Sequence, residues 1–494
     1  MFGFFASFSN SVTVSRCVGA QDFTFLPLCG KIYKISRRKT VCFGNNINSP
    51  ERGKHIMSKK IIIAGAGHGG LIAGALLAEK GYDVTVYERH IRDDLGYDWE
   101  DSVEKKIFRE CSLPEPEEGT YKPGVSMKFY NPNLKSSITV RPSGEGSIMI
   151  ERKPLFKMLL ENAEKKGVHF VFNTEILAPI TDGLRVVGIK TTDGDVFGDL
   201  VIDAAGINSP VRRNLPVCCN VDRDYDYGEC FYAYRAYFDK LPAPEPEVNY
   251  EVFLKPDGEQ GISWVITTKD TVDILIGRMQ PLSKLELEAE LEKMRKFSPQ
   301  IGHKVLRGGS TFQIPVRRPL SVMVCDGYAA IGDSAYMTLP MTGSGICASM
   351  RAGIILADVV SKDTNDEFSA KTLWEYNKRY ILHFGLNFAA IDILKNIIIC
   401  METDGLNFLF DKQIITENDM SFGKGNGGSV SFSDIASRAI RGIGNLPALL
   451  RTAGALSKGD AAKKVYREIP QEYSVPAVLK WKADVLAATA FMVR

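Results

Sequence analysis

The sequence predicts an α/β fold in which a parallel, nucleotide-binding layer is combined with an antiparallel sheet and ends in helices. Three observations lead to this fold class: a β-α-β pattern with a glycine-rich turn at 60–88, four alternating segments within 229–278, and helical periodicity after residue 361. Alternating strands and helices form parallel sheets, whereas short strands at hairpin spacing form antiparallel ones. The chain therefore combines both kinds of sheet.

The glycine-rich turn at 65–70, with the sequence GAGHGG, lies between the apolar segment 60–64 and an Ala/Leu-rich helix. Gly65 permits the tight turn, Gly67 lets the backbone approach a pyrophosphate, and Gly70 lets helix and strand pack closely. The helix N-terminus presents free N–H groups to the phosphates. This pattern predicts a dinucleotide site, and a glycine turn without function is the alternative.

The second strand of the β-α-β unit ends at Glu88. An acid at this position accepts hydrogen bonds from the adenosine ribose and disfavours a 2′-phosphate there. We also count the next residue, Arg89, among the expected cofactor contacts.

Two later segments are suited to holding the remainder of a larger dinucleotide. In the first, an apolar strand runs into a small-residue turn, with Asp203 and Gly206 as candidate contacts. In the second, a buried strand ends at Asp333, and a glycine-broken loop opens a long helix near Gly345. Such a helix directs about half a positive charge at whatever lies before it. The alternative is an ordinary connection in which Asp333 caps the helix.

In these segments the chain resembles the superfamily of FAD-dependent aromatic hydroxylases and geranylgeranyl reductases. The resemblance implies that Asp333 binds the flavin ribitol and that Arg152 faces the cofactor. It also implies a loop beside the flavin ring, formed by Pro340, Thr342, Gly343, Ser344 and Gly345. We therefore expect FAD rather than NAD as the tightly held cofactor.

The resemblance specifies the fold class as an FAD-binding Rossmann-like domain of the glutathione reductase type, with an inserted antiparallel substrate domain and C-terminal helices. We expect an FAD-binding domain at 57–215 and 308–360, a substrate domain at 216–307, and a helical region at 361–494. Four strands are predicted in the substrate domain, at 230–238, 248–254, 261–268 and 271–278. In the superfamily this sheet covers the substrate pocket over the flavin.

Two residues are candidates for substrate contact. Trp264 lies in a segment similar to the Tyr-x-Trp-x-Phe signature of prenyl reductases, although only the Trp is present; a core aromatic residue is the alternative. Tyr336 is chosen by its position beside the flavin loop, and no side chain is identified as catalytic. The stretch 93–101 replaces a cysteine of those reductases with aromatic and acidic residues, which indicates either a different substrate or mechanism or an exposed acidic loop.

The resemblance implies an FAD-dependent oxidoreductase that reduces C=C bonds of an isoprenoid or other small apolar, lipid-like substrate by hydride transfer from reduced flavin. One alternative is an FAD monooxygenase that hydroxylates an aromatic substrate. Hydroxylases usually carry an Asp where this chain has Ala205, which puts direct reduction by NADPH in doubt. Another alternative is a non-catalytic flavin-binding redox or docking subunit. NADPH, NADH and reduced ferredoxin stay open as electron donors.

Composition excludes several classes of function. The formal charge of +2, from 61 basic and 59 acidic residues, gives no field for a nucleic-acid partner. The ten cysteines lack Cys-x-x-Cys spacing and the six histidines lack ligand spacing, so no metal site is predicted. The apolar stretch 61–78 approaches the length of a membrane span, but its glycines favour a nucleotide-binding strand and helix, and no other stretch is expected to span a bilayer.

The two ends of the chain differ from the rest. Residues 1–56 have Asp22 as their only acid before Glu51, a composition typical of an organelle transit peptide. We favour a cytoplasmic protein that begins at Met57, and we expect the preceding segment to be disordered. Near the other end, 435–456 combines helical apolar spacing with three arginines and could make peripheral contact with an anionic membrane; a helix packed on its own domain is the commoner arrangement.

Overall fold

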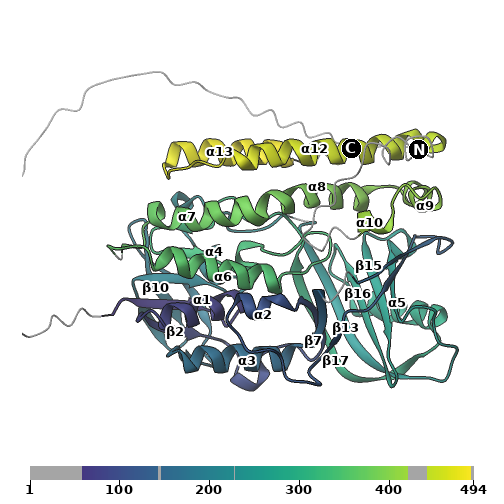
Figure 1. Ribbon diagram of the computed structural model, residues 1–494, viewed down its shortest axis with the longest axis horizontal. Helices are drawn as coiled ribbons and strands as arrows, with labels where there is room; N and C mark the ends of the chain where they lie inside the picture. The colour runs from purple at the N-terminus through teal and green to yellow at the C-terminus, as the bar shows by residue number, and fades with distance from the viewer. Residues whose placement is uncertain (1–57, 143–145, 227, 366, 421–441, 491–494) are drawn as a thin grey trace, which may run out of the picture. The chain divides into compact units, whose positions relative to one another are not determined.

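The computed structural model describes residues 58–142, 146–226, 228–365, 367–420 and 442–490 (Figure 1). The predicted transit-like segment 1–56 lies outside these residues, as do Arg438 and Arg441 of the predicted membrane-contacting helix.

A six-stranded sheet in the order β18-β19-β12-β1-β2-β8 forms the centre of the nucleotide-binding part. Neighbouring strands are parallel except β18 and β19, which are antiparallel. The central strand β1 (KIIIA) is an apolar run, as expected for a parallel strand buried on both faces. The strands are β1 Lys60–Ala64, β2 Asp83–Tyr87, β8 His169–Val171, β12 Leu200–Asp203, β18 Val324–Cys325 and β19 Tyr328–Ala330.

Three helices pack around this sheet: α1 (His68–Ala78), α3 (Arg152–Lys165) and α6 (Ile346–Val360). The backbones of α1 and α6 approach each other closely at two glycines. A Cβ atom on Gly69 would lie 2.5 Å from the Ser349 carbonyl oxygen, and one on Gly353 would lie 2.5 Å from the Gly69 carbonyl oxygen. The crossing of the two helices therefore requires glycine on both sides.

A seven-stranded sheet in the order β17-β13-β16-β15-β14-β5-β6 forms the second part. The four predicted strands are confirmed as β13 Cys230–Lys240, β14 Tyr250–Leu254, β15 Gly261–Thr267 and β16 Thr271–Arg278. The sheet is wider than predicted, since β17 (Ile301–Pro315) extends it at one edge and β5 (Met127–Tyr130) and β6 (Ser137–Val140) at the other. The predicted boundary at 307/308 therefore cuts through β17, and residues assigned to the first domain contribute two strands here.

Smaller elements complete these two parts. Helix α5 (Lys284–Phe297) begins with a capping box between Ser283 and Glu286 and packs on the apolar side of the second sheet through Met294. The remaining elements are β3 Glu100–Glu104, α2 Lys106–Glu110, β4 Tyr121–Pro123, β7 Ser147–Glu151, β9 Ile176–Asp182, β10 Arg185–Thr191, β11 Gly194–Phe197 and α4 Pro210–Arg213.

The C-terminal part is helical, as predicted, and α12 and α13 lie over α7 and α8 (Figure 1). Helices α7 (Ala370–Tyr380) and α8 (Leu386–Cys400) join through a π-helical turn into one helix, Ala370–Cys400, which corrects the expectation that only 61–78 approaches a membrane span. Among the described residues it alone is long and apolar enough to cross a membrane, and 39% of its apolar window is buried in the protein. The other helices are α9 Thr403–Asp411, α10 Glu417–Met420, α12 Leu446–Arg467 and α13 Val475–Thr489.

Candidate functional site

The site begins where the order of the strands in the central sheet reverses. From β1 the chain proceeds to β2 on one side, whereas β12 occupies the other side and continues to β19. Ligands of open α/β sheets bind in the crevice beyond the carboxyl ends of such strands. Here this position is formed by the turns after β1 and β12. Cβ atoms on Gly65 and on Gly67 would each lie 2.8 Å from the carbonyl oxygen of Ala204, so larger residues are excluded from both positions.

The N-terminus of α1 is open toward this position. Its N-cap residue, Gly67, supplies no side-chain cap, and of the first-turn N–H groups that of Gly69 donates to the Ser349 hydroxyl at 3.0 Å. A Cβ atom on Gly70 would lie 2.7 Å from the Cβ of Ala204, which keeps the helix close to β12. The positive end of the helix dipole and these N–H groups can bind a pyrophosphate.

His68, the first residue of α1, lies beside Phe156 with 4.5 Å between the ring centroids. Burial lowers the pKa of His68 well below its usual value, and the positive charge of Arg152 lowers it further. His68 is therefore neutral at physiological pH.

Glu88 connects the glycine turn to the end of β2. Its Oε2 accepts a hydrogen bond from the backbone N–H of Ala66 at 2.8 Å, and its Oε1 accepts one from that of His90 at 3.0 Å. Each oxygen retains a lone pair for a ribose hydroxyl. The predicted neighbour Arg89 is exposed, and its Nε lies 3.1 Å from the His90 ring nitrogen.

Replacing Glu88 by Ala is expected to weaken FAD binding moderately. A hydrogen bond to a charged acceptor contributes about 1.5–3 kcal/mol, and the turn also loses its clamp on Ala66. Titration of the apoprotein with FAD checks this expectation. An unchanged dissociation constant would exclude Glu88 from the cofactor site.

Asp203 does not fit its predicted role as a direct cofactor ligand. Its side chain is completely buried and accepts four hydrogen bonds from protein donors, which occupy its lone pairs. The donors are the Ala205 N–H and the hydroxyls of Ser209, Tyr328 and Ser334, at 2.6–3.1 Å. Asp203 therefore holds the turn after β12 to β19 and to the segment after it.

Asp333 has the opposite environment. Its carboxylate is half-buried, and no hydrogen bond to it is found among the described residues. The alternative in which it caps α6 is wrong, because the N-cap residue Gly345 receives no side-chain cap. Burial raises the pKa of Asp333 to about 6, although Arg152 and Arg212 act in the opposite direction. An open carboxylate of this kind can accept hydrogen bonds from a polyol such as ribitol.

The raised pKa of Asp333 gives the apoprotein a pH-dependent stability. An unfolded aspartate has a pKa of about 3.9, so the protonated form is favoured in the folded state. This contribution is fully present below about pH 4 and is lost as the pH rises through about 6. We expect wild-type apoprotein to lose stability relative to Asp333→Asn between about pH 4 and 7. Urea denaturation of both proteins checks this, and parallel pH profiles would contradict it.

The remaining predicted glycines and Arg152 lie around Asp333. Gly206 adopts a positive φ of 87° and donates its N–H to the Ser334 hydroxyl at 2.9 Å, which joins the second and third segments. Gly343 has a φ of 68°, and a Cβ there would lie 3.3 Å from Ile314 of β17. The loop before α6 therefore touches the seven-stranded sheet.

Arg152 begins α3 and binds Asp101 through its Nη1 at 2.8 Å. Its guanidinium carbon lies 5.2 Å from the centre of the Tyr97 ring. Its Nε atom is buried without a hydrogen-bond partner among the described residues. Because its charge also acts on Asp333 and His68, Arg152 lies near both the first and third segments.

Tyr336 is misplaced as a substrate contact. Its side chain is completely buried between the guanidinium groups of Arg212 and Arg317, whose carbons lie 4.6 and 4.7 Å from the ring centre. Burial raises the pKa of Tyr336 to about 12. The backbone at this residue is left-handed, with φ 55°, and the buried ring does not reach the position that sequence proximity to the loop predicts.

Trp264 lies on an apolar side of the seven-stranded sheet. Its indole is half-buried and belongs to a cluster with Phe231, Leu275, Phe312, Ile314 and Ile399. Ile399 comes from α8, so the cluster is bounded by both the sheet and the C-terminal helices. Ile314 also lies beside Gly343 of the predicted flavin loop. This apolar cluster is therefore adjacent to the proposed cofactor site.

Sequence reasoning missed several residues of this region. Arg235 is 2% exposed, and its guanidinium carbon lies 5.3 Å from the centre of the Trp264 ring and 5.5 Å from that of Trp99. Tyr97 and Trp99 stack at 4.3 Å with an interplanar angle of 5°. The aromatic and acidic stretch 93–101 carried the only signal, although its composition is compatible with either a site or an exposed loop.

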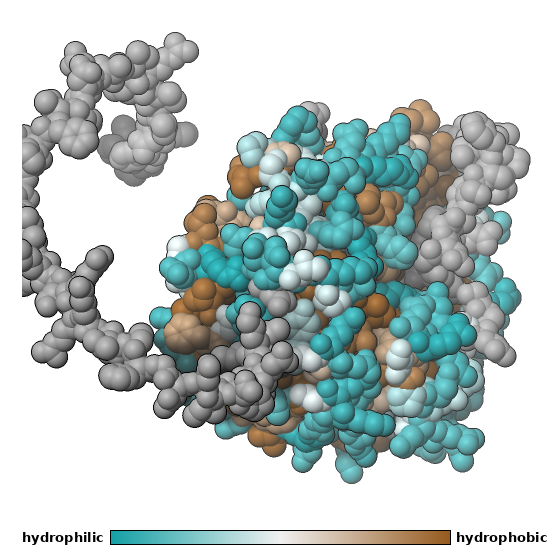
Figure 2. Space-filling view, turned by 60° about the vertical axis from the view of Figure 1, so that its left-hand side comes forward, coloured by the Kyte–Doolittle hydropathy of each residue, from teal (hydrophilic) through white to brown (hydrophobic). Residues whose placement is uncertain are grey.

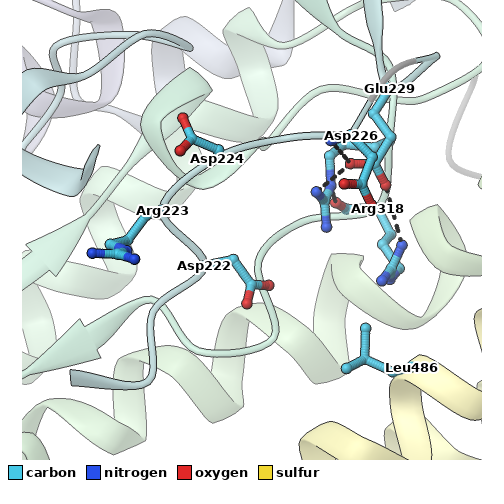
Figure 3. Close-up of a pocket in the computed structure, with 8 residues that line it drawn as sticks. Asp222, Arg223, Asp224, Asp226, Glu229, Arg318 and Leu486 are labelled. Carbon is cyan, nitrogen blue, oxygen red and sulfur yellow. Dashed lines mark hydrogen bonds and ion pairs between the residues drawn. The ribbon is translucent and has the colours of Figure 1, made fainter. Parts of the chain in front are cut away.

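A separate polar cavity of about 350 Å³ lies near the C-terminal helix α13 (Figure 3). Glu229 pairs there with Arg317 at 2.5 Å and with Arg318 at 3.6 Å. The cavity is lined by Asp222, Arg223, Asp224, Asp226, Glu229, Arg317, Arg318 and Leu486. Arg317, which lines this cavity, also packs on the ring of Tyr336.

The residues fit a flavin dinucleotide in three respects. The turn at Gly65 and Gly67 leaves no room for a Cβ, the N-cap residues of α1 and α6 are glycines without a capping side chain, and the Asp333 carboxylate is open. Together these groups can hold a pyrophosphate, a polyol and an electron-rich ring edge.

Known proteins are similar to this chain in sequence or in fold. A digeranylgeranylglycerophospholipid reductase of Sulfolobus acidocaldarius is 25% identical over 441 residues, which cover 86% of this chain and 96% of the relative. The crystal structure of a geranylgeranyl bacteriochlorophyll reductase-like protein of Thermoplasma acidophilum matches with a TM-score of 0.65 and 18% identity over 81% of this chain and 99% of the other. A flavin-dependent brominase matches with a TM-score of 0.56 and 16% identity, over 82% of this chain and 100% of the other.

The FAD binding domain family matches residues 58–381, which include all three segments of the site. Because this match covers more than half of the chain, the protein belongs to the FAD binding domain family.

Proposed function

We propose that this protein is an FAD-dependent reductase of C=C bonds in an isoprenoid chain. The observation that carries the proposal is the apolar cluster around Trp264, which touches the loop before α6 through Ile314. The Sulfolobus relative, 96% of which aligns with this chain, is by name a reductase of a digeranylgeranyl lipid. An apolar chain beside the flavin is the substrate class that suits this surface.

Each part of the site has a distinct task in this proposal. The glycine turn and the α1 N-terminus bind the pyrophosphate, Glu88 binds the adenosine ribose, and Asp333 binds the ribitol. Arg152 and the N-terminus of α6 place positive charge near the ring system, which favours an electron-rich ring. When bound and reduced, FAD would supply the hydride, and the second hydrogen added to the C=C bond would arrive as a proton.

The substrate is held by burial of its chain. Each methylene removed from water contributes about 0.8 kcal/mol, so the aliphatic and aromatic side chains of the apolar cluster suffice for affinity without a charged partner. Half-buried Ile262, Phe312 and Ile399 provide such contacts beside Trp264.

Two other functions use the same cofactor. A monooxygenase acting on an aromatic substrate shares the fold, but Ala205 stands where hydroxylases usually carry an Asp. A non-catalytic redox or docking subunit would bind FAD without turnover. NADPH, NADH and reduced ferredoxin are the electron donors to be compared.

Peripheral contact with a membrane is a further part of the proposal, because a lipid-like substrate is drawn from one. Helix α12 exposes Leu446 by 56% and Leu450 by 61%, beside the exposed Arg451. Figure 2 shows hydrophobic residues in separate patches among hydrophilic ones on the face that it presents. Exposed leucines flanked by basic side chains can bind the interface of a membrane.

An anaerobic reduction experiment tests the function. The FAD-loaded enzyme is reduced with dithionite, freed of excess reductant and mixed with geranylgeraniol. We expect reoxidation of the flavin and a product that is heavier by two hydrogen atoms for each reduced bond, detected by mass spectrometry. Trp264→Ala should slow this reaction, whereas the control Trp481→Phe, on α13, should not. Reoxidation only by oxygen, with hydroxylation of an added phenol, would favour the monooxygenase instead.

A further inference from the structure

A row of side chains with alternating charges, buried at one end and partly exposed at the other, joins the substrate sheet to the proposed cofactor site. Arg152, at the start of α3, donates to Asp101 Oδ2 at 2.8 Å. The other oxygen of Asp101 accepts from Arg235 Nη1 at 3.2 Å. Arg235 in turn binds Asp273 through two hydrogen bonds of 3.0 and 2.6 Å. Asp101 is thus the single carboxylate in this row that contacts both arginines.

The two arginines belong to different parts of the molecule. Arg152 acts electrostatically on Asp333 and His68, which belong to the proposed cofactor site. Arg235 lies on β13 of the seven-stranded sheet and packs against the ring of Trp264. Asp101 lies between them on β3, so a movement of either guanidinium changes the environment of the other through one carboxylate.

The charges within the row are balanced in pairs. Arg235 and Asp273 are each 2% exposed and form a closed pair. Arg152 pairs with Asp101, whose side chain is 28% exposed. Removing the charge of Asp101 therefore leaves Arg152 without its ion-pair partner.

The segment that carries Asp101 is fixed to α3 by its backbone. The N–H of Arg152 donates to the Trp99 carbonyl oxygen at 3.0 Å. Gly96 has a φ of 86°, and a Cβ there would lie 3.1 Å from the Arg152 carbonyl oxygen. Trp99 packs on the Arg235 guanidinium at 5.5 Å. The segment 96–101 therefore holds both arginines in fixed positions.

We propose that Asp101 is a positioning residue that orients Arg152 at the cofactor and partly neutralises its charge. Through its second oxygen, Asp101 couples Arg152 to Arg235 under the substrate. The coupling to substrate rests on the proposed function. Because linkage is reciprocal, a chain bound on the Trp264 surface changes the electron affinity of the cofactor, and the redox state of the cofactor changes the affinity for the chain.

The reduction potential of the bound flavin tests the first half of this proposal without turnover. In Asp101→Asn the unneutralised Arg152 favours reduced, anionic flavin, so the potential shifts to a more positive value. Asp101→Glu restores the charge and should return the potential toward that of wild type. The matched control is Asp98→Asn in the same segment, because Asp98 is 45% exposed and lies 3.6 Å from Arg307, which keeps its pair with Glu151. Equal potentials in Asp101→Asn and Asp98→Asn, or a lower potential in Asp101→Asn, overturn the proposal.

The second half is tested with geranylgeraniol as the probe and the visible flavin spectrum of the oxidised holoenzyme as the readout. Wild type and Asp98→Asn should show a spectral change on addition of the probe, and Asp101→Asn should lose most of it. An undiminished change in Asp101→Asn overturns the coupling. If wild type itself shows no change and no binding, the proposed substrate class fails, and the potentials alone decide whether Asp101 positions Arg152. Thermal denaturation identifies a variant that has lost its fold, in which case Asp101→Glu and Asp101→Ser are compared instead.

Discussion

Asp333→Ala is expected to yield largely colourless protein after purification. The open carboxylate is the strongest hydrogen-bond acceptor that the third segment presents toward the site, and Gly345 leaves no other side chain at the start of α6. Hydrogen bonds to a charged group contribute about 1.5–3 kcal/mol each, and a polyol can form two of them with one carboxylate. The amount of FAD released on denaturation, per chain, measures the effect.

The same substitution should leave the apoprotein folded. No hydrogen bond of the described residues depends on the Asp333 side chain, and its raised pKa shows that ionisation there is unfavourable without a ligand. Asp195→Ala, at an exposed position of β11, is the matched control and should retain its full colour. Full flavin occupancy in Asp333→Ala would remove this residue from the cofactor site.

Asp203→Ala should reduce the stability of the apoprotein itself. The substitution leaves the hydroxyls of Ser209 and Tyr328 and the N–H of Ala205 without their acceptor, whereas the Ser334 hydroxyl can still donate to the Gly206 carbonyl oxygen. An unsatisfied buried polar group costs about 1–3 kcal/mol, so the expected loss is about 3 kcal/mol or more. Ser209 also caps α4 by accepting from the N–H groups of Val211 and Arg212, so the damage should extend to that helix.

Urea denaturation of FAD-free protein measures this effect, with Asp195→Ala again as the control. Asp203→Asn should be intermediate, because it keeps one acceptor oxygen. If Asp203→Ala lost FAD but kept the stability of wild-type apoprotein, Asp203 would be a cofactor ligand after all, and the description of its buried environment would be wrong.

The sequence predicted those parts of the fold that depend on local patterns. The glycine turn at 65–70 directly follows the apolar strand β1, so the β-α-β unit could be recognised from adjacent residues alone. The four strands from 230 to 278 could be recognised as short apolar segments at hairpin spacing, although both faces of the sheet that they form pack on apolar clusters. The π-helical turn that joins α7 to α8 could not be foreseen, because polar residues in α7 conceal the apolar continuation.

The roles of single side chains depended on distant partners and were predicted less well. A carboxylate at the end of a strand looks the same in the sequence whether it faces a ligand, as proposed for Asp333, or the interior, as for Asp203. The difference arises from Tyr328 and Ser334, which lie more than a hundred residues from Asp203. The role of Asp101 could likewise not be predicted, because the two arginines that it contacts come from α3 and β13. Strands β5 and β6, the last two of the seven-stranded sheet, have four residues each, too few to show which sheet they join.

The central claim is that three segments distant in the sequence, around Gly65, Asp203 and Asp333, come together to hold one FAD. The most direct test is the cofactor content of the full chain, purified in the presence of FAD and freed of unbound flavin. We predict about one FAD per chain, released by denaturation and identified by its visible absorption and mass. Folded protein that retains no flavin under these conditions would contradict the account.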